Sequence, residues 1–139
     1  MSAPNDQEAL AELLSAAGFV AAEEEAAELL ARAAGDVELL GSLVDRRLSG
    51  EPLAWITGRV SFCGLEIQVD SGVYVPRRQS EPLARRAVER LPATGTAIDL
   101  CTGSGAIART LMANRPDARV VASDIDERAV ACAAANGVE

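Results

Sequence analysis

Apolar residues in the first fifty positions recur at the three- and four-residue spacing of amphipathic helices. Three such stretches follow one another, and each ends at a glycine, which readily adopts the left-handed conformation that terminates many helices. Asn5 or Asp6 can cap the first helix, and Asp36 can cap the third. The predicted helices end at Gly18, Gly35 and Gly50. Short amphipathic helices joined by tight connections predict a small helical bundle.

The pattern changes after residue 50. Residues 51–58, Glu-Pro-Leu-Ala-Trp-Ile-Thr-Gly, predict an irregular connection. Apolar and polar residues then alternate with a period of two on either side of Gly64, which predicts a short β-hairpin over residues 60–69. Residues 73–75 are expected to extend this hairpin up to Pro76.

The last sixty residues show alternating helix and strand patterns. Ser80 is the expected N-cap of a helix whose inner face carries Leu83, Ala87, Val88 and Leu91. Strands are predicted over residues 97–100 and 119–123, and helices over residues 106–114 and 127–136. This β-α-β-α order predicts an α/β protein that contains the first half of a Rossmann-like, doubly wound parallel sheet.

Composition narrows the class of protein. No apolar stretch approaches the roughly 20 residues of a membrane span, and the first residues are polar and acidic, so we expect a soluble, cytoplasmic protein with no membrane partner. Residues 1–50 carry ten acids against three arginines, which argues against direct nucleic-acid binding. The chain has no histidine and three widely separated cysteines, so no metal site and no disulfide framework is predicted.

The candidate chemistry lies at the ends of the two predicted parallel strands. Asp99 ends the first strand, a turn through Gly103 and Gly105 follows it, and Asp124 ends the second strand. Ligands of such sheets bind beyond the carboxyl ends of the strands, and a carboxylate at the second strand can accept hydrogen bonds from both ribose hydroxyls. A helix N-terminus after a glycine turn provides free N–H groups. The sequence therefore predicts a site for an adenosine-like ligand.

Two ligand classes fit this site. Residues 103–108, Gly-Ser-Gly-Ala-Ile-Ala, satisfy the dinucleotide pattern G-x-G-x-x-A, so a dinucleotide-binding oxidoreductase module is one alternative. Asp99 favours S-adenosyl-L-methionine, because a carboxylate beside the turn repels a pyrophosphate but attracts the ammonium of a methionine end.

Four segments resemble, in order, those of the protein N5-glutamine methyltransferase family, which uses S-adenosyl-L-methionine to modify class 1 peptide chain release factors. Residues 50–58, GEPLAWITG, are similar to its G-x-P-x-x-Y-I-x-G segment, and residues 62–65, FCGL, to F-x-G-x. Residues 75–81, VPRRQSE, are similar to I-P-R-P-E-T-E, and residues 99–108, DLCTGSGAIA, to the cofactor motif D-L-G-T-G-S-G-A-I-A.

The resemblance implies three regions and a set of cofactor-binding residues. Residues 1–50 would form a helical, substrate-engaging domain, residues 51–78 a connector with the hairpin, and residues 79–139 the start of the class I methyltransferase domain. The implied cofactor-binding residues are Asp99, Cys101, Thr102, Gly103, Gly105, Asp124 and Ile125.

The sequence departs from the family at three places. Cys101 replaces the first glycine of the cofactor motif, which is acceptable only if that position does not require positive φ. Arg78 and Gln79 replace a proline and an acid. The family's Asn-Pro-Pro-Tyr motif, which holds the substrate amide, is absent from the sequence, so no catalytic residue is assigned.

These departures predict a truncated or divergent methyltransferase that is inactive alone. Its two-stranded sheet is expected to expose part of its apolar surface. A further alternative is a non-catalytic fragment that binds a partner, with a second chain completing the sheet.

Overall fold

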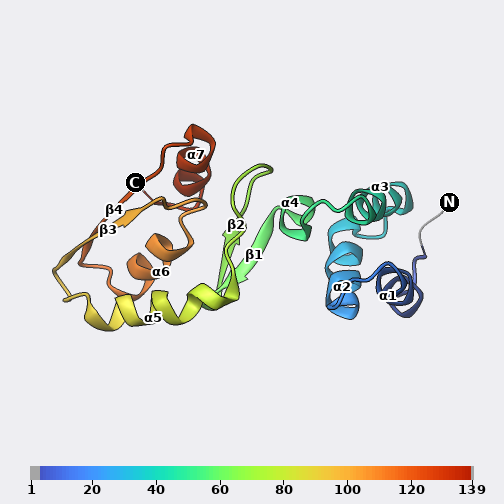
Figure 1. The fold of residues 1–139 in the computed structure, drawn as a ribbon, viewed down its shortest axis with the longest axis horizontal. Helices are drawn as coiled ribbons and strands as arrows, with labels where there is room; N and C mark the ends of the chain where they lie inside the picture. The colour runs from blue at the N-terminus through green and yellow to red at the C-terminus, as the bar shows by residue number, and fades with distance from the viewer. Residues whose placement is uncertain (1–3, 139) are drawn as a thin grey trace. The chain divides into compact units, whose positions relative to one another are not determined.

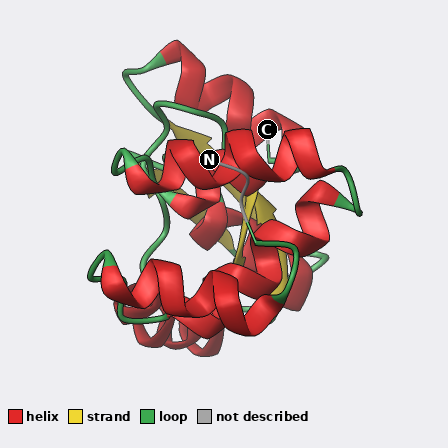
Figure 2. Ribbon diagram, turned by 90° about the vertical axis from the view of Figure 1, so that its right-hand side faces the viewer, coloured by secondary structure: helices red, strands yellow, loops and turns green. Residues whose placement is uncertain are grey.

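The computed structural model describes residues 4–138, which form two compact units, Met1–Thr57 and Gly58–Glu139. Figure 1 labels the helices and strands along the chain, and Figure 2 shows the strands in yellow among the more numerous helices. The first unit consists of α1 (Gln7–Ala16), α2 (Ala22–Ala33), α3 (Val37–Leu48) and α4 (Leu53–Thr57). The second unit contains two separate two-stranded sheets and the remaining helices.

The first three helices confirm the helical pattern and its caps. Asp6 accepts a hydrogen bond from the N–H of Ala9, and Asp36 accepts one from the N–H of Leu39, as N-cap residues do. The prediction of an irregular connection over residues 51–58 was wrong, because α4 forms a short helix there. Pro52 immediately precedes α4 and accepts the N–H groups of Trp55 and Ile56 at its carbonyl.

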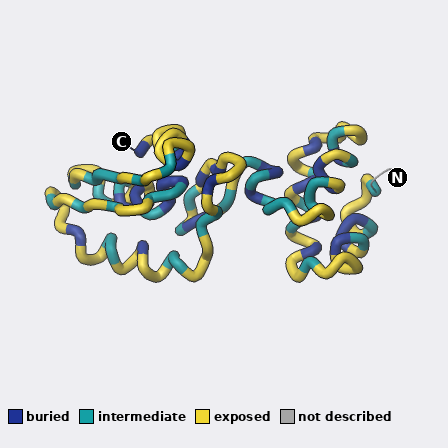
Figure 3. The backbone as a smooth tube through the Cα atoms, turned by 45° about the horizontal axis from the view of Figure 1, so that its top comes forward, coloured by how far each residue is buried: buried dark blue, intermediate teal, exposed yellow. Residues whose placement is uncertain are grey.

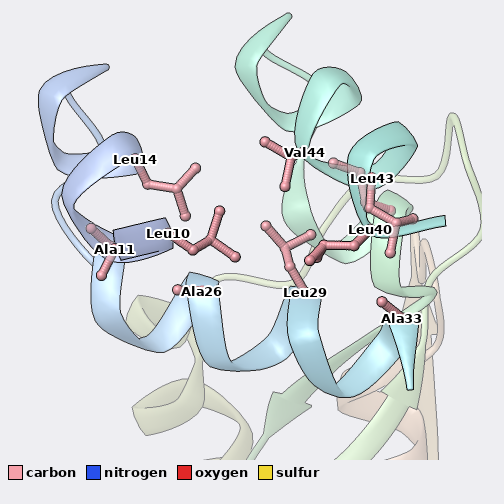
Figure 4. Close-up of a cluster of buried hydrophobic side chains, with 11 residues drawn as sticks. Leu10, Ala11, Leu14, Ala26, Leu29, Ala33, Leu40, Leu43 and Val44 are labelled. Carbon is pink, nitrogen blue, oxygen red and sulfur yellow. The ribbon is translucent and has the colours of Figure 1, made fainter. Parts of the chain in front are cut away.

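The core of the first unit is built from leucine and alanine side chains of α1, α2 and α3. Leu10, Leu14 and Leu29 are fully buried. Figure 4 shows these side chains and their neighbours pointing toward one another from the three helices. At the edge of this core, Arg47 pairs with Glu25 and lies over the ring of Phe19 at 3.9 Å from its centroid. The small alanines allow the helices to approach closely, so a compact core forms with few aromatic residues.

The predicted hairpin is present as β1 (Arg59–Phe62) and β2 (Leu65–Gln68), which pair antiparallel. Its two-residue loop, Cys63 and Gly64, has φ of 51° and 78°. Positive φ at both loop residues matches the type I′ turn, whose twist suits the two strands. The expected extension of the hairpin through residues 73–75 was wrong, because these residues form no strand.

A helix follows the hairpin as predicted, but its buried face differs. The 3-10 turn η1 (Arg78–Ser80) leads into α5 (Glu81–Arg90), and Ser80 makes no side-chain cap hydrogen bond. Ala84 is fully buried, whereas Leu83 is 63% exposed. Adjacent residues of a helix point about 100° apart, so Ala84 lies on the face of Val88 and Leu91, which packs against α6, and Leu83 lies off that face.

The remaining elements form the predicted β-α-β-α unit. They are β3 (Thr96–Leu100), α6 (Ala106–Asn114), β4 (Arg119–Ser123) and α7 (Glu127–Ala135). The two strands pair in parallel, with Thr96 opposite Arg119 and Leu100 opposite Ser123. This arrangement places the carboxyl ends of both strands at the same edge of the sheet (Figure 1).

The two faces of this parallel sheet are covered differently. Val120 and Ala122 pack against a cluster that includes Ala133 of α7. On the other face, Ile98 and Leu100 of β3 are 66% and 70% exposed, and Figure 3 shows the strand residues as intermediate or exposed. The predicted exposure of apolar sheet surface is therefore present in this chain.

Candidate functional site

Asp99 lies one residue before the end of β3, on the strand face that α6 covers. Its Oδ2 atom accepts a hydrogen bond from the hydroxyl of Thr102 at 2.8 Å and one from the N–H of Ala108 at 3.2 Å. Among residues 4–138, no hydrogen bond reaches its Oδ1 atom. One carboxylate oxygen therefore fixes the start of the turn, and the other is available to a cationic group.

The segment from Cys101 to Gly105 turns the chain from β3 into α6. Gly103 and Gly105 have φ of 59° and 81°, which is the left-handed region that glycine adopts without strain. The N–H of Thr102 donates to the carbonyl of Ser123 at 3.0 Å, and the N–H of Gly105 donates to the carbonyl of Thr102 at 2.9 Å. The first bond joins the turn to the end of β4, and the second closes the turn itself.

Cys101 occupies a position that does require positive φ. Its φ is 58°, and its side chain is exposed. The expectation that this position does not require positive φ was therefore wrong. The left-handed conformation costs a non-glycine residue such as Cys101 about 1–2 kcal/mol. The hydrogen bond from Thr102, the next residue, to β4 holds the chain in this conformation.

Asp124 follows β4 and reaches the glycine turn. Its Oδ2 atom accepts the N–H of Gly103 at 2.9 Å, and its Oδ1 atom accepts the N–H of Asp126 at 3.0 Å. The N–H groups of Asp126 and then Gly103 hold the pKa of the Asp124 carboxyl below its ordinary value. The carboxylate is thus charged at neutral pH, and each of its oxygens keeps a lone pair for a further donor.

The structure brings most of the predicted residues together at the carboxyl ends of β3 and β4. Asp99, Thr102, Gly103 and Asp124 form a continuous network at the carboxyl ends of β3 and β4. Ile125 lies next to Asp124 with a fully exposed side chain. A fully exposed apolar side chain is suited to contact a flat apolar group.

Gly105 shows why the turn needs a second glycine. A Cβ atom there would lie 3.0 Å from the Cβ of Ala133 and 3.1 Å from the Cγ2 of Val138. At Gly103, by contrast, a Cβ atom would meet nothing within 4 Å. Gly105 therefore permits close packing of α6 against the end of α7, whereas the space around Gly103 is open.

Sequence reasoning missed one residue that supports the turn. The side-chain amide of Asn136, at the end of α7, donates to the carbonyl of Ser104 at 2.8 Å. Its position before Gly137 at a predicted helix end was a signal for a helix terminus, and nothing in the sequence pattern indicated a contact with residue 104.

The part of the chain that the structure describes shows no group of three His, Cys, Asp or Glu side chains that could hold a metal ion. Within the same residues, no helix is long and apolar enough to cross a membrane.

Comparison with known protein families agrees with this geometry. The family model described as the methyltransferase small domain matches residues 65–139, which include the hairpin strand β2, the glycine turn and Asp124. The chain belongs to the methyltransferase small domain family. The elements that this family match covers are those that carry the candidate site, whereas α1, α2 and α3 lie outside it.

Curated relatives extend the similarity toward the N-terminus. A release factor glutamine methyltransferase from Neisseria gonorrhoeae is 44% identical over 97 residues, which cover 70% of this chain and 36% of the relative. The protein of the same name from Thermodesulfovibrio yellowstonii is 41% identical over 99 residues, covering 68% of this chain and 36% of the relative. The protein of the same name from Streptomyces coelicolor is 44% identical over 92 residues, which cover 63% of this chain and 33% of the relative. The chain thus spans about a third of the length of the curated relatives it matches.

Proposed function

We propose that this chain binds S-adenosyl-L-methionine at the carboxyl ends of β3 and β4. The observation that carries the proposal is the pairing of Asp124 with the N–H of Gly103, which places a charged carboxylate beside an open glycine turn. Asp124 would accept the ribose hydroxyls, and the free oxygen of Asp99 would accept the ammonium of the methionine end. Cys101, Thr102, Gly105 and Ile125 would line the same site.

The donor set at the turn fits this cofactor better than a dinucleotide. Asp99 and Asp124 place two carboxylates around the turn, and the described residues give it no cationic hydrogen-bond partner. A pyrophosphate would bring two negative charges to this position, whereas the methionine end brings an ammonium. S-adenosyl-L-methionine supplies an electrophilic methyl group on a sulfonium when bound, and the residues of this chain would hold its two ends.

We further propose that the methyl group is destined for a glutamine amide of a class 1 peptide chain release factor. The relatives bear the name release factor glutamine methyltransferase, and the match to the methyltransferase small domain family covers the candidate site. An amide nitrogen is a weak nucleophile and has to be held in line with the methyl group. Because the sequence contains no Asn-Pro-Pro-Tyr motif, we expect no methyl transfer by this chain alone, as measured with radiolabelled cofactor and purified release factor.

The first unit would engage the protein substrate. A hollow of about 1130 Å³ lies against α1 and α2 in this unit. Among the described residues, its lining includes five carboxylates and no cation: Asp6, Glu8, Glu12, Glu23 and Glu24. Such a surface favours a basic protein segment and disfavours a nucleic-acid backbone.

Calorimetric titration of the whole chain with S-adenosyl-L-methionine and, separately, with NAD tests the proposed site. We expect binding of S-adenosyl-L-methionine only, weakened about tenfold or more in Asp124→Ala, because two hydrogen bonds to a charged acceptor are lost. Asp117→Ala is the matched control, because it removes the same charge from an exposed turn of the same unit and should leave the affinity unchanged. Binding of NAD alone, or equal affinities for the two variants, would contradict the proposal.

A further inference from the structure

One side chain at the end of α7 joins three segments that are far apart in the sequence. The Nδ2 atom of Asn136 donates to the carbonyl of Gln68 in β2 at 2.9 Å and to the carbonyl of Ser104 in the glycine turn at 2.8 Å. It also lies 3.2 Å from the carbonyl of Cys132 in its own helix. Its Oδ1 atom accepts the N–H of Gln68 at 2.9 Å. Both polar atoms of the amide are therefore used.

The local sequence fixes where this side chain stands. The helix α7 ends with Gly137 at φ 76°, whose N–H donates to the carbonyl of Ala134 at 2.9 Å. The N–H of Val138 reaches back to the carbonyl of Ala133 at 3.0 Å. These two bonds form a Schellman motif, with Val138 and Ala133 in the accompanying apolar contact. Asn136, immediately before the glycine, is held at a defined point.

The same helix end contacts the glycine turn at two consecutive residues. Ala133 and Val138 lie against Gly105 so closely that a Cβ atom there would approach them at 3.0 and 3.1 Å. Asn136 binds the carbonyl of Ser104, a residue that is only 2% exposed. A buried carbonyl needs a hydrogen-bond partner, and Asn136 supplies it.

The peptide unit between Ser104 and Gly105 is thus fixed from both sides. Its carbonyl accepts from Asn136, and its N–H donates to the carbonyl of Thr102 at 2.9 Å. Because a peptide unit is planar, two bonds on opposite sides determine its orientation. This peptide stands between the Gly103 N–H that meets Asp124 and the first turn of α6.

We propose that Asn136 is a positioning residue for the cofactor turn. By holding the carbonyl of Ser104, it sets the direction of the turn and keeps Gly103 in reach of Asp124, while its bonds to Gln68 tie the hairpin to the same point. The ligand of this turn, S-adenosyl-L-methionine, rests on the proposed function. Asn136, which lies outside the glycine motif, would then be one of the residues that determine the affinity for this ligand.

The variant Asn136→Asp separates an effect on the orientation of the turn from an effect on the overall stability of the fold. A carboxylate of nearly the same size keeps an acceptor for the N–H of Gln68 but has no hydrogen to donate to Ser104. The matched control is Cys132→Ala. The Cys132 thiol bonds the same carbonyl of Gln68, with Sγ to O at 3.4 Å, and none of its side-chain hydrogen bonds among the described residues reaches the turn.

The experiment measures two quantities for the whole chain and both variants: the Kd of S-adenosyl-L-methionine by calorimetry and the exchange rate of the Gly105 amide hydrogen by NMR. In Asn136→Asp we expect a Kd raised about tenfold and amide exchange accelerated about tenfold, because the buried carbonyl of Ser104 loses its hydrogen bond from Asn136. In Cys132→Ala both quantities should stay within about twofold, even where the overall stability falls.

The outcomes separate this inference from the proposed function. A wild-type chain that binds no S-adenosyl-L-methionine overturns the proposed function, and the inference is then decided by the Gly105 amide alone. Unchanged exchange at Gly105 in Asn136→Asp, or equal changes in Asn136→Asp and Cys132→Ala, would overturn the inference. Faster exchange in Asn136→Asp with wild-type affinity would limit Asn136 to a structural role and would also overturn it.

Discussion

The two units of this chain are organised by different forces. In the first unit, α1, α2 and α3 bury leucine and alanine side chains against one another, and Leu10, Leu14 and Leu29 have no exposed surface. In the second unit, β3 leaves Ile98 and Leu100 largely exposed, and the glycine turn is held by hydrogen bonds to main-chain groups. The helical unit depends on burial of apolar surface, whereas the turn depends on backbone conformation and polar contacts.

This difference explains where substitutions are tolerated. An apolar core responds to changes in volume, and the cost grows with the cavity that is left. A glycine turn responds to any Cβ atom that its conformation or its neighbours exclude. The two regions should therefore fail under different kinds of substitution.

The largest expected effect is in the helical core. Leu29→Ala should lower the free energy of unfolding of the first unit by about 2–5 kcal/mol, because it removes a fully buried side chain from the centre of three helices. Urea unfolding followed by the fluorescence of Trp55, which lies in α4 of this unit, measures it. As a control, Ile98→Ala removes a side chain that is 66% exposed, and should change the stability of the second unit, measured by amide hydrogen exchange, by less than about 0.5 kcal/mol. Similar decreases in the free energy of unfolding for Leu29→Ala and Ile98→Ala would contradict the proposed difference between the units.

An intermediate effect is expected in the turn. Gly105→Ala should lower the free energy of unfolding of the second unit by about 1–3 kcal/mol. Its Cβ atom would press on Ala133 and Val138, and its φ is 81°. Gly103→Ala has a similar φ but open space around the new atom, and should cost only about 1 kcal/mol. Amide hydrogen exchange across α6 and α7 measures both. A larger loss for Gly103→Ala would show that conformation alone, and not packing against α7, governs the turn.

The smallest effect is a gain in stability. Cys101→Gly should raise the stability of the second unit by about 0.5–1 kcal/mol, because the relief of left-handed strain at φ 58° exceeds the added freedom of glycine in the unfolded chain. Cys101→Ala keeps a Cβ atom in the same conformation and should give no gain. The same hydrogen-exchange measurement compares the two variants, and equal stabilities would place the strain elsewhere.

The parts of the fold that depend on local pattern could be predicted from the sequence. Helix spacing and the capping aspartates located α1 and α3, and alternation around Gly64 located the hairpin. The glycine turn and its two carboxylates could also be predicted, because strand ends in a parallel sheet share an edge. Each of these features is determined within a short stretch of chain or by a topological rule.

The features that were missed depend on contacts between distant segments. Ala84 rather than Leu83 is buried, because the face that α6 covers runs through Ala84, Val88 and Leu91, and the greater hydrophobicity of leucine did not decide which residue faces the neighbouring helix. The bond from Asn136 to Ser104 joins residues 32 positions apart and follows no pattern in either segment. The positive φ of Cys101 was not expected because cysteine, unlike glycine, disfavours it.

The three thiols of the chain differ in their access to reagents. Cys132 is buried, and this burial raises the pKa of its thiol. Cys63 is partly covered, and Cys101 is exposed at the carboxyl end of β3. A maleimide dye should therefore label Cys101 first. Because Cys101 would line the proposed site, a bound ligand should slow its labelling, so the labelling rate could report ligand occupancy without engineering a cysteine into the protein.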